Sequence, residues 1–132
     1  MKFKKDSAIV LVSGGMDSSL TAAIAGLKYE LNFLHINYGQ RTEQRELKAF
    51  KDIAKYYKVK NKLVVDISYL KDIGGSSLTD KKIKISKADL KNIKNKTVPS
   101  SYVPFRNANI LSIAVSWAEI IKAKKIFIGA VE

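Results

Sequence analysis

The stretch SGGMDSS, residues 13–19, has the residue types of a phosphate-binding loop. Two glycines let backbone N–H groups approach a ligand closely, and the serine hydroxyls supply further hydrogen-bond donors. A helix that begins directly after such a loop points the positive end of its dipole at the same place. The loop is not a Walker motif, because no lysine lies between Gly14 and Lys28, and it does not fit GxGxxG either.

Two further segments carry polar residues that suit a planar or anionic ligand. NYGQR places Tyr38, Gln40 and Arg41 after an expected strand, and Arg106 and Asn107 open an expected helix. An amide and a guanidinium can hold a heterocycle or an anion, and a tyrosine ring can stack on a purine-like ring. The alternatives are an exposed, helix-capping turn for Gln40 and Arg41, a helix cap for Asn107, and a core position for Tyr38.

Other polar residues give weaker signals. His35 is the single histidine, and we expect a structural packing role because no acidic residue or cysteine lies close to it in the sequence. The cluster Gly74, Gly75, Ser76 and Ser77 fits either a second oxygen-binding turn or a flexible hinge, and both readings remain open.

Strands and helices alternate along the chain and must position these residues. Continuous apolar runs predict strands at residues 8–13, 31–37, 62–67 and 125–129, and helical spacing predicts helices at residues 17–30, 42–57 and 106–123. The alternation predicts an α/β fold, an open parallel sheet with helices on both faces in a Rossmann-like arrangement. Ligands of such sheets bind beyond the carboxyl ends of the strands, where the strand order reverses. We therefore expect SGGMDSS, YGQR and FIGAVE, which each follow a strand, and VPFRN, which opens the last helix, to converge on one crevice.

The apolar positions also predict which helix faces are buried. In residues 17–30 the expected core face is Leu20, Ala23, Ile24 and Leu27, with good capping residues at the start. In residues 42–57 it is Leu47, Phe50, Ala54 and Tyr57. Residues 106–123 are apolar on nearly all sides, so this helix, with Trp117 in the core, is expected to be deeply buried. Residues 68–104 have no clear core face and suggest a functional lid or substrate region.

Length and composition limit the classes of protein that fit. With 132 residues, 46% of them hydrophobic, the chain suits a single domain over residues 1–132. Of 24 basic residues only three are arginine, which favours a solvated lysine-rich surface over a nucleic-acid-binding face, although the net charge of +12 would also attract a nucleotide or tRNA. No apolar run has the roughly 18 residues of a membrane span, and we expect a cytoplasmic protein.

The motifs together carry a family resemblance. SGGMDS matches the pyrophosphate loop (PP-loop) of the ATP pyrophosphatase superfamily, whose fold is of the adenine nucleotide alpha hydrolase type and whose members activate a carboxylate or carbonyl oxygen by adenylation. With NYGQR, IGGSSLTD (73–80), YVPFRN (102–107) and AEIIKAKKIFIGAVE (118–132), the sequence from about Ile9 to Glu132 resembles the 7-cyano-7-deazaguanine synthase family of queuosine precursor biosynthesis.

The resemblance implies a reaction and a set of site residues. ATP would adenylate the carboxylate of 7-carboxy-7-deazaguanine, ammonia would displace AMP to give an amide, and a second ATP would drive dehydration to the nitrile, with Mg²⁺ on the phosphates. Asp17 and Ser18 are the implied catalytic residues, and Tyr38, Gln40 and Arg41 the implied substrate-binding residues. The implied ATP-binding residues are Val12, Ser13, Gly14, Gly15, Met16, Asp17, Ser18, Ser19, Arg106 and Asn107. Asp17 is expected to cap the helix or to reach metal-bound water.

The sequence also departs from the family pattern. Family members continue past the last expected strand and carry a four-cysteine zinc cluster, whereas this sequence ends at Glu132 and contains no cysteine. We expect a fragment of a longer enzyme rather than a shortened relative, with Zn²⁺ bound only in the longer chain. Homodimers are common in the family. The competing hypotheses are an adenylating enzyme with another acceptor, such as tRNA, and an inactive module that binds ATP without turnover.

Overall fold

The computed structural model describes residues 4–73 and 106–129. Its strands are β1 (Ser7–Leu11), β2 (Glu30–Asn37), β3 (Asn61–Asp66) and β4 (Lys125–Ile128). Its helices are α1 (Met16–Gly26), α2 (Glu43–Tyr56), α3 (Tyr69–Ile73) and α5 (Arg106–Ile121). The cluster Gly74, Gly75, Ser76 and Ser77 lies outside the described residues. Among those that are described, no helix is both long enough and apolar enough to cross a membrane.

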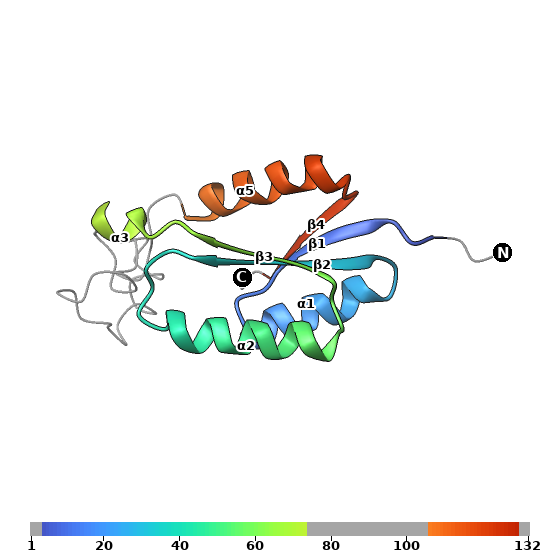
Figure 1. The fold of residues 1–132 in the computed structure, drawn as a ribbon, viewed down its shortest axis with the longest axis horizontal. Coiled ribbons are helices and arrows are strands. Elements are labelled where there is room, and N and C mark those ends of the chain that lie inside the picture. Colours follow the sequence, from blue (N-terminus) through green and yellow to red (C-terminus); the bar gives the residue numbers. More distant parts are fainter. Residues whose placement is uncertain (1–3, 74–105, 130–132) are drawn as a thin grey trace, which may run out of the picture.

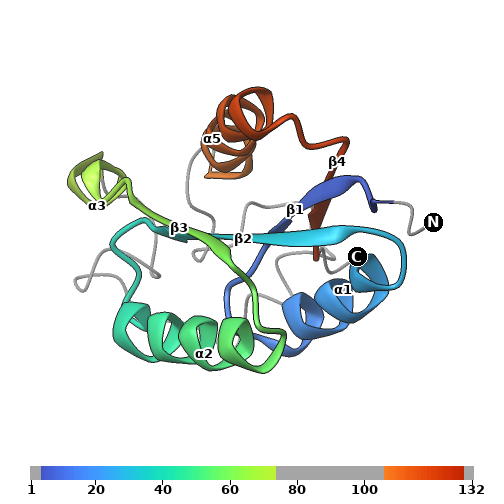
Figure 2. The same cartoon turned by 45° about the vertical axis from the view of Figure 1, so that its right-hand side comes forward.

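The strands form one parallel sheet of order β3-β2-β1-β4, with helices on both faces (Figures 1 and 2). Helices α1 and α2 lie on one face, and α5 covers β1 and β4 on the other. The predicted open parallel α/β sheet is thus confirmed. Strand order reverses at β1, so the loops that follow β1, β2 and β4 meet beside the start of α5, as the sequence predicts.

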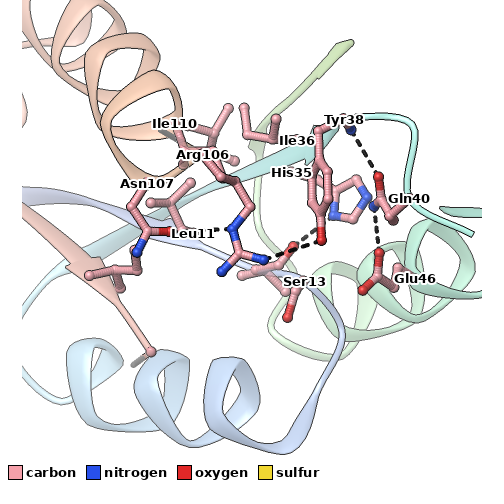
Figure 3. A pocket seen from close by; sticks show the side chains of 14 residues that line it. Leu11, Ser13, His35, Ile36, Tyr38, Gln40, Glu46, Arg106, Asn107 and Ile110 are labelled. Carbon is pink, nitrogen blue, oxygen red and sulfur yellow. Dashed lines mark hydrogen bonds between the residues drawn. The ribbon is translucent and has the colours of Figure 1, made fainter. Parts of the chain in front are cut away.

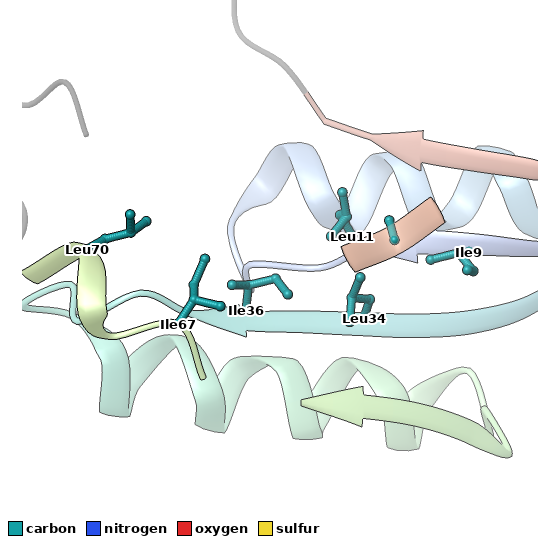
Figure 4. Close-up of a cluster of buried hydrophobic side chains, with 7 residues drawn as sticks. Ile9, Leu11, Leu34, Ile36, Ile67 and Leu70 are labelled. Atoms are coloured by element: carbon teal, nitrogen blue, oxygen red, sulfur yellow. The ribbon is translucent and has the colours of Figure 1, made fainter. Parts of the chain in front are cut away.

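Successive strand residues point to opposite faces of the sheet, so the core has two hydrophobic clusters, one on each face. Each cluster holds helices to its face. The cluster under α5 contains Ile9, Leu11, Leu34, Ile36, Ile67, Leu70 and Ala114 (Figure 4). The cluster over α1 and α2 contains Val10, Val12, Ala22, Ala25, Phe33, Phe50 and Ala54. Phe50 and Ala54 are buried, with Leu47 and Tyr57 packed against them, so the predicted core face of α2 is confirmed.

The predicted core face of α1 is wrong. Leu20, Ile24 and Leu27 are 60%, 56% and 78% exposed, whereas the buried residues of the helix are Ser18, Ala22 and Ala25. Small side chains on the inner face allow the helix backbone to approach β1 and β4 closely. The helix also ends at Gly26 rather than at residue 30, because Glu30 begins β2.

Two further predictions need correction. Helix α5 is not deeply buried: Ala114 is its one buried residue, and Leu111, Val115 and Ile120 are exposed. The sheet covers one side of this helix, where Trp117 packs against the cluster, as expected for a core residue. The start of the segment 68–104 does have a core face, because α3 buries Leu70.

Candidate active site

The loop after β1 depends on glycine at position 14. Gly14 has φ +92°, a conformation that side-chain-bearing residues rarely adopt, and an added Cβ would lie 2.6 Å from the Cβ of Ala49 on α2. Gly15 is then the N-cap of α1 in an extended conformation, and the helix begins at Met16. The first-turn N–H groups of a helix have no partners within it and face the space where a ligand would sit. The geometry fits the predicted phosphate-binding loop.

Two serines close this loop from within. The Ser13 N–H donates to Ser18 Oγ at 3.0 Å, and the hydroxyl oxygens of the two residues lie 2.8 Å apart. Ser18 is 5% exposed, whereas Ser13 is exposed. Ser18 therefore holds the two ends of the loop together, and Ser13 offers the more accessible hydroxyl to a ligand.

Asp17 does not cap α1, so the first of its two expected roles is wrong. The N-cap is Gly15, which has no side chain to make a capping hydrogen bond, and Asp17 lies exposed in the first helical turn. The backbone of Asp17 is close to the end of β4, since a Cβ added to Gly129 would lie 3.1 Å from the carbonyl oxygen of Asp17. Asp17 is thus an acidic residue in the first turn of α1, where the helix dipole favours negative charge.

A cavity of about 250 Å³ opens beside this loop (Figure 3). It lies at the carboxyl ends of β1 and β2, below the start of α5 and next to the end of β4. Its polar lining residues are Ser13, His35, Tyr38, Gln40, Glu46, Arg106 and Asn107, and its apolar ones include Leu11, Leu34, Ile36 and Ile110. The convergence of the polar loops that the sequence predicted therefore takes place.

Arg106 and Tyr38 form one polar wall of the cavity. Arg106 Nη1 donates to the Tyr38 hydroxyl at 3.4 Å, and its guanidinium carbon lies 5.6 Å from the centre of the tyrosine ring. Burial raises the pKa of the Tyr38 phenol above 10.0, the charge of Arg106 opposes this rise, and that of Glu46 adds to it. Asn107 Oδ1 accepts from Arg106 Nε at 3.4 Å, and as the second residue of α5 Asn107 is not its cap.

Gln40 is buried and fixes the turn after β2. It is 4% exposed, which excludes the exposed turn considered for it. Its Oε1 accepts from the Tyr38 N–H at 2.8 Å, and its Nε2 donates to Glu46 on α2. Glu46 was not singled out from the sequence. Because a helix begins directly after the turn, a residue in its first turn lies close to Gln40 although it is six positions later. Arg41 is exposed and lines a separate hollow with Asp66 and Lys71, so the structure does not bring it into the cavity of Tyr38 and Gln40.

His35 has the structural role that the sequence predicts, with added hydrogen bonds. It is 1% exposed and stacks on Phe50, with ring centres 5.0 Å apart. Its Nδ1 lies 2.7 Å from the carbonyl oxygen of Val12, and its Nε2 lies 3.0 Å from Asn37 Oδ1. A carbonyl can only accept, so Nδ1 carries a proton. His35 thereby ties β2 to the residue that precedes the phosphate loop.

The residues of the site fit one of the two implied metals. Mg²⁺ is commonly held by one or two carboxylates together with the phosphates of a nucleotide, and Asp17 offers one carboxylate at the loop. Zn²⁺ needs cysteine or histidine ligands, and the chain has no cysteine. In the parts of the chain that the structure describes, no three His, Asp or Glu residues are grouped as a metal site. The zinc site therefore has no counterpart here.

Comparisons with known proteins identify the relatives of this chain. A family model described as "Queuosine biosynthesis protein QueC" matches residues 7–132. The chain is 59% identical over 126 residues to the 7-cyano-7-deazaguanine synthase of Chlorobium phaeobacteroides (strain BS1) and 58% identical to that of Chloroherpeton thalassium. Each alignment covers 95% of this chain and 54% of the relative, so the chain spans about half the length of these relatives.

A solved structure shares the fold. The NH3-dependent NAD synthetase of Campylobacter jejuni superposes with a TM-score of 0.50 at 14% sequence identity, over 90% of this chain and 45% of that protein. At this identity the likeness shows the fold alone.

Proposed function

Because the chain belongs to the family of the queuosine biosynthesis protein QueC, we propose that it forms the ATP-binding part of a 7-cyano-7-deazaguanine synthase. The proposed reaction converts 7-carboxy-7-deazaguanine and ammonia to 7-cyano-7-deazaguanine. The carboxylate oxygen attacks the α-phosphorus of ATP and pyrophosphate leaves. Ammonia then displaces AMP to give the amide, and a second ATP activates the amide oxygen for loss as AMP, which leaves the nitrile.

The observation that carries this proposal is the placement of the glycine loop. The loop lies where the strand order reverses, in front of α1, and it opens onto a cavity with a guanidinium on its wall. We propose that backbone N–H groups and hydroxyls of residues 12–19 bind the phosphates of ATP. Ser13 would contact a phosphate oxygen directly, and Ser18 would keep the loop in shape through its bonds to Ser13.

Asp17 is the residue proposed to hold Mg²⁺ at the loop, directly or through water. The metal would supply neutralisation of the charge that develops on the departing pyrophosphate. The exposed position of Asp17 in the first turn of α1 supports this role, because the first turn follows the glycine loop directly.

The second half of the proposal concerns the heterocyclic substrate. Arg106, with Asn107 beside it, would attract the carboxylate or a phosphate of ATP, and the ring of Tyr38 would form a flat wall for the heterocycle. Gln40 would act by fixing Tyr38, since its side chain is already engaged at both ends. Arg41 would contact substrate only from the neighbouring hollow.

The remaining parts of the proposal concern the whole protein. We propose a single domain over residues 1–132, a homodimer, and a cytoplasmic location where ATP is available. No step of the scheme uses zinc.

The test is product analysis. The protein is incubated with ATP, Mg²⁺, ammonium and 7-carboxy-7-deazaguanine, and the nucleotide and heterocycle products are identified by mass spectrometry. We expect AMP, pyrophosphate and the nitrile. ADP as the nucleotide product would refute adenylation, and ATP binding without turnover would favour a nucleotide-binding module.

A further inference from the structure

The cavity beside the phosphate loop has opposite charges on two of its walls. Arg106 contributes a guanidinium from α5 and Glu46 a carboxylate from α2, with Tyr38 standing between them (Figure 3). Among the described residues, the Glu46 carboxylate makes one hydrogen bond, through Oε2 to Gln40. The other oxygen of this carboxylate is therefore able to accept from a ligand in the cavity.

The helix dipole alone does not explain why Glu46 faces the cavity, because it acts equally on Glu43 in the same turn. Glu43 also lies in the first turn of α2, and it lines the separate hollow with Arg41. Glu46 instead faces the cavity, where its charge adds to the raised pKa of Tyr38. Hydrogen bonds from N–H donors stabilise a partly buried carboxylate most. Gln40 donates to one oxygen of Glu46 only. Gln40 is in turn fixed by the Tyr38 N–H, so the carboxylate is held in one orientation.

We infer that Glu46 binds the exocyclic amino group of a purine-type heterocycle that occupies this cavity. The apolar walls at Leu11, Leu34 and Ile110 suit the faces of such a ring, and about 250 Å³ suits one bicyclic ring rather than a whole nucleotide. Arg106, which lies on the other side of Tyr38 from Glu46, would then contact the anionic part of the ligand. The inference rests on the proposed function, which supplies two such rings: the adenine of ATP and the deazaguanine of the substrate.

Two ligand pairs test the inference by isothermal titration calorimetry on this chain. One pair is 7-carboxy-7-deazaguanine and its analogue with hydrogen in place of the 2-amino group. The other is ATP and purine riboside triphosphate, which lacks the 6-amino group. We expect the unmodified protein to prefer the amino member of one pair by about tenfold to a hundredfold, as for a hydrogen bond to a charged group. The pair that shows the preference identifies the ring.

The variant Glu46→Gln should lose that preference. Its single amide oxygen would accept from Gln40, and its NH2 group would face the ligand, where it cannot accept from an amino group. Glu43→Gln removes the same charge from the same helical turn and should keep the preference. Thermal unfolding of both variants shows whether they fold like the unmodified protein.

Three results would overturn the inference. They are equal affinity for both members of both pairs in the unmodified protein, a full preference retained by a folded Glu46→Gln, and no binding of any of the four ligands. The comparison of ligands on the unmodified protein needs no variant. An amino preference without AMP or nitrile formation would reject the proposed reaction and keep this inference, so the two failures are distinguishable.

Discussion

Helices α1 and α2 lie side by side on one face of the sheet, yet they bury opposite kinds of side chain (Figure 1). Helix α2 presents Phe50 to the core, whereas α1 presents Ala22 and Ala25 and leaves Leu20 and Ile24 exposed. The alanines allow α1 to lie close to β1 and β4, so that its first turn meets the end of β4. The difference shows that α2 supplies packing volume, while α1 supplies a close approach to the sheet at the glycine loop.

Phe50→Ala should have the largest effect on stability. Phe50 is 1% exposed and contacts the rings of Phe33 and His35. Its removal leaves a cavity, and we expect a loss of about 3–5 kcal/mol in the free energy of unfolding, measured by urea denaturation. A loss below about 1 kcal/mol would mean that α2 does not anchor this face of the sheet.

Gly14→Ala tests the contact between the phosphate loop and α2. The positive φ and the close approach to Ala49 both oppose a methyl group, so we expect a loss of about 1–3 kcal/mol in unfolding free energy. We also expect weaker ATP binding by calorimetry, because the loop must shift to relieve the contact. Gly15→Ala is the matched control, since an added Cβ there would meet the Ser13 hydroxyl at 3.6 Å without backbone strain. Equal losses in the two variants would contradict this account of the loop.

Tyr38→Phe tests the turn between β2 and α2 through the pH dependence of the free energy of unfolding. The pKa of Tyr38 is raised above 10.0 in the folded state, so the neutral phenol contributes stability that is fully present below pH 10 and is lost as pH rises through the folded pKa. The difference in unfolding free energy between the unmodified protein and the variant should therefore stay constant up to about pH 9 and shrink as the pH rises above about 10. A difference that grows over this range would show that Tyr38 ionises more easily in the folded chain.

Leu20→Ala should have the smallest effect. Leu20 is 60% exposed, so we expect a change within about 0.5 kcal/mol in the free energy of unfolding. The contrast with Phe50→Ala is the sharpest form of the comparison between the helices. A loss of about 2 kcal/mol or more would show that the outer face of α1 is covered in the protein in solution.

The sequence predicted the strands, the sheet class and the glycine loop before α1 because these depend on local patterns. Apolar runs mark the buried strands, and the glycine pair marks a backbone conformation that other residues avoid. The buried face of α1 was predicted wrongly because two faces of that helix are apolar. Hydrophobicity alone favours the face with the larger Leu20 and Ile24. Which face packs depends on the distance between helix and sheet, and this is set by tertiary contacts.

The same limit applies within the site. The exposed turn was the alternative considered for Gln40, yet its side chain is buried and its partner Glu46 comes from the next helix. Glu46 drew no prediction from the sequence, because an acidic residue in a first helical turn is common. The signal that could have found the pair is their spacing across the turn, which becomes meaningful only once the helix is known to begin at Glu43.

The central claim is that a carboxylate is adenylated at the loop between β1 and α1. The most direct measurement uses 7-carboxy-7-deazaguanine whose carboxylate carries heavy oxygen, with mass spectrometry of the nucleotide and phosphate products. We predict that the label appears in AMP, because the oxygen that attacks the α-phosphorus leaves with it. Heavy oxygen in inorganic phosphate, with ADP as the nucleotide product, would contradict the account.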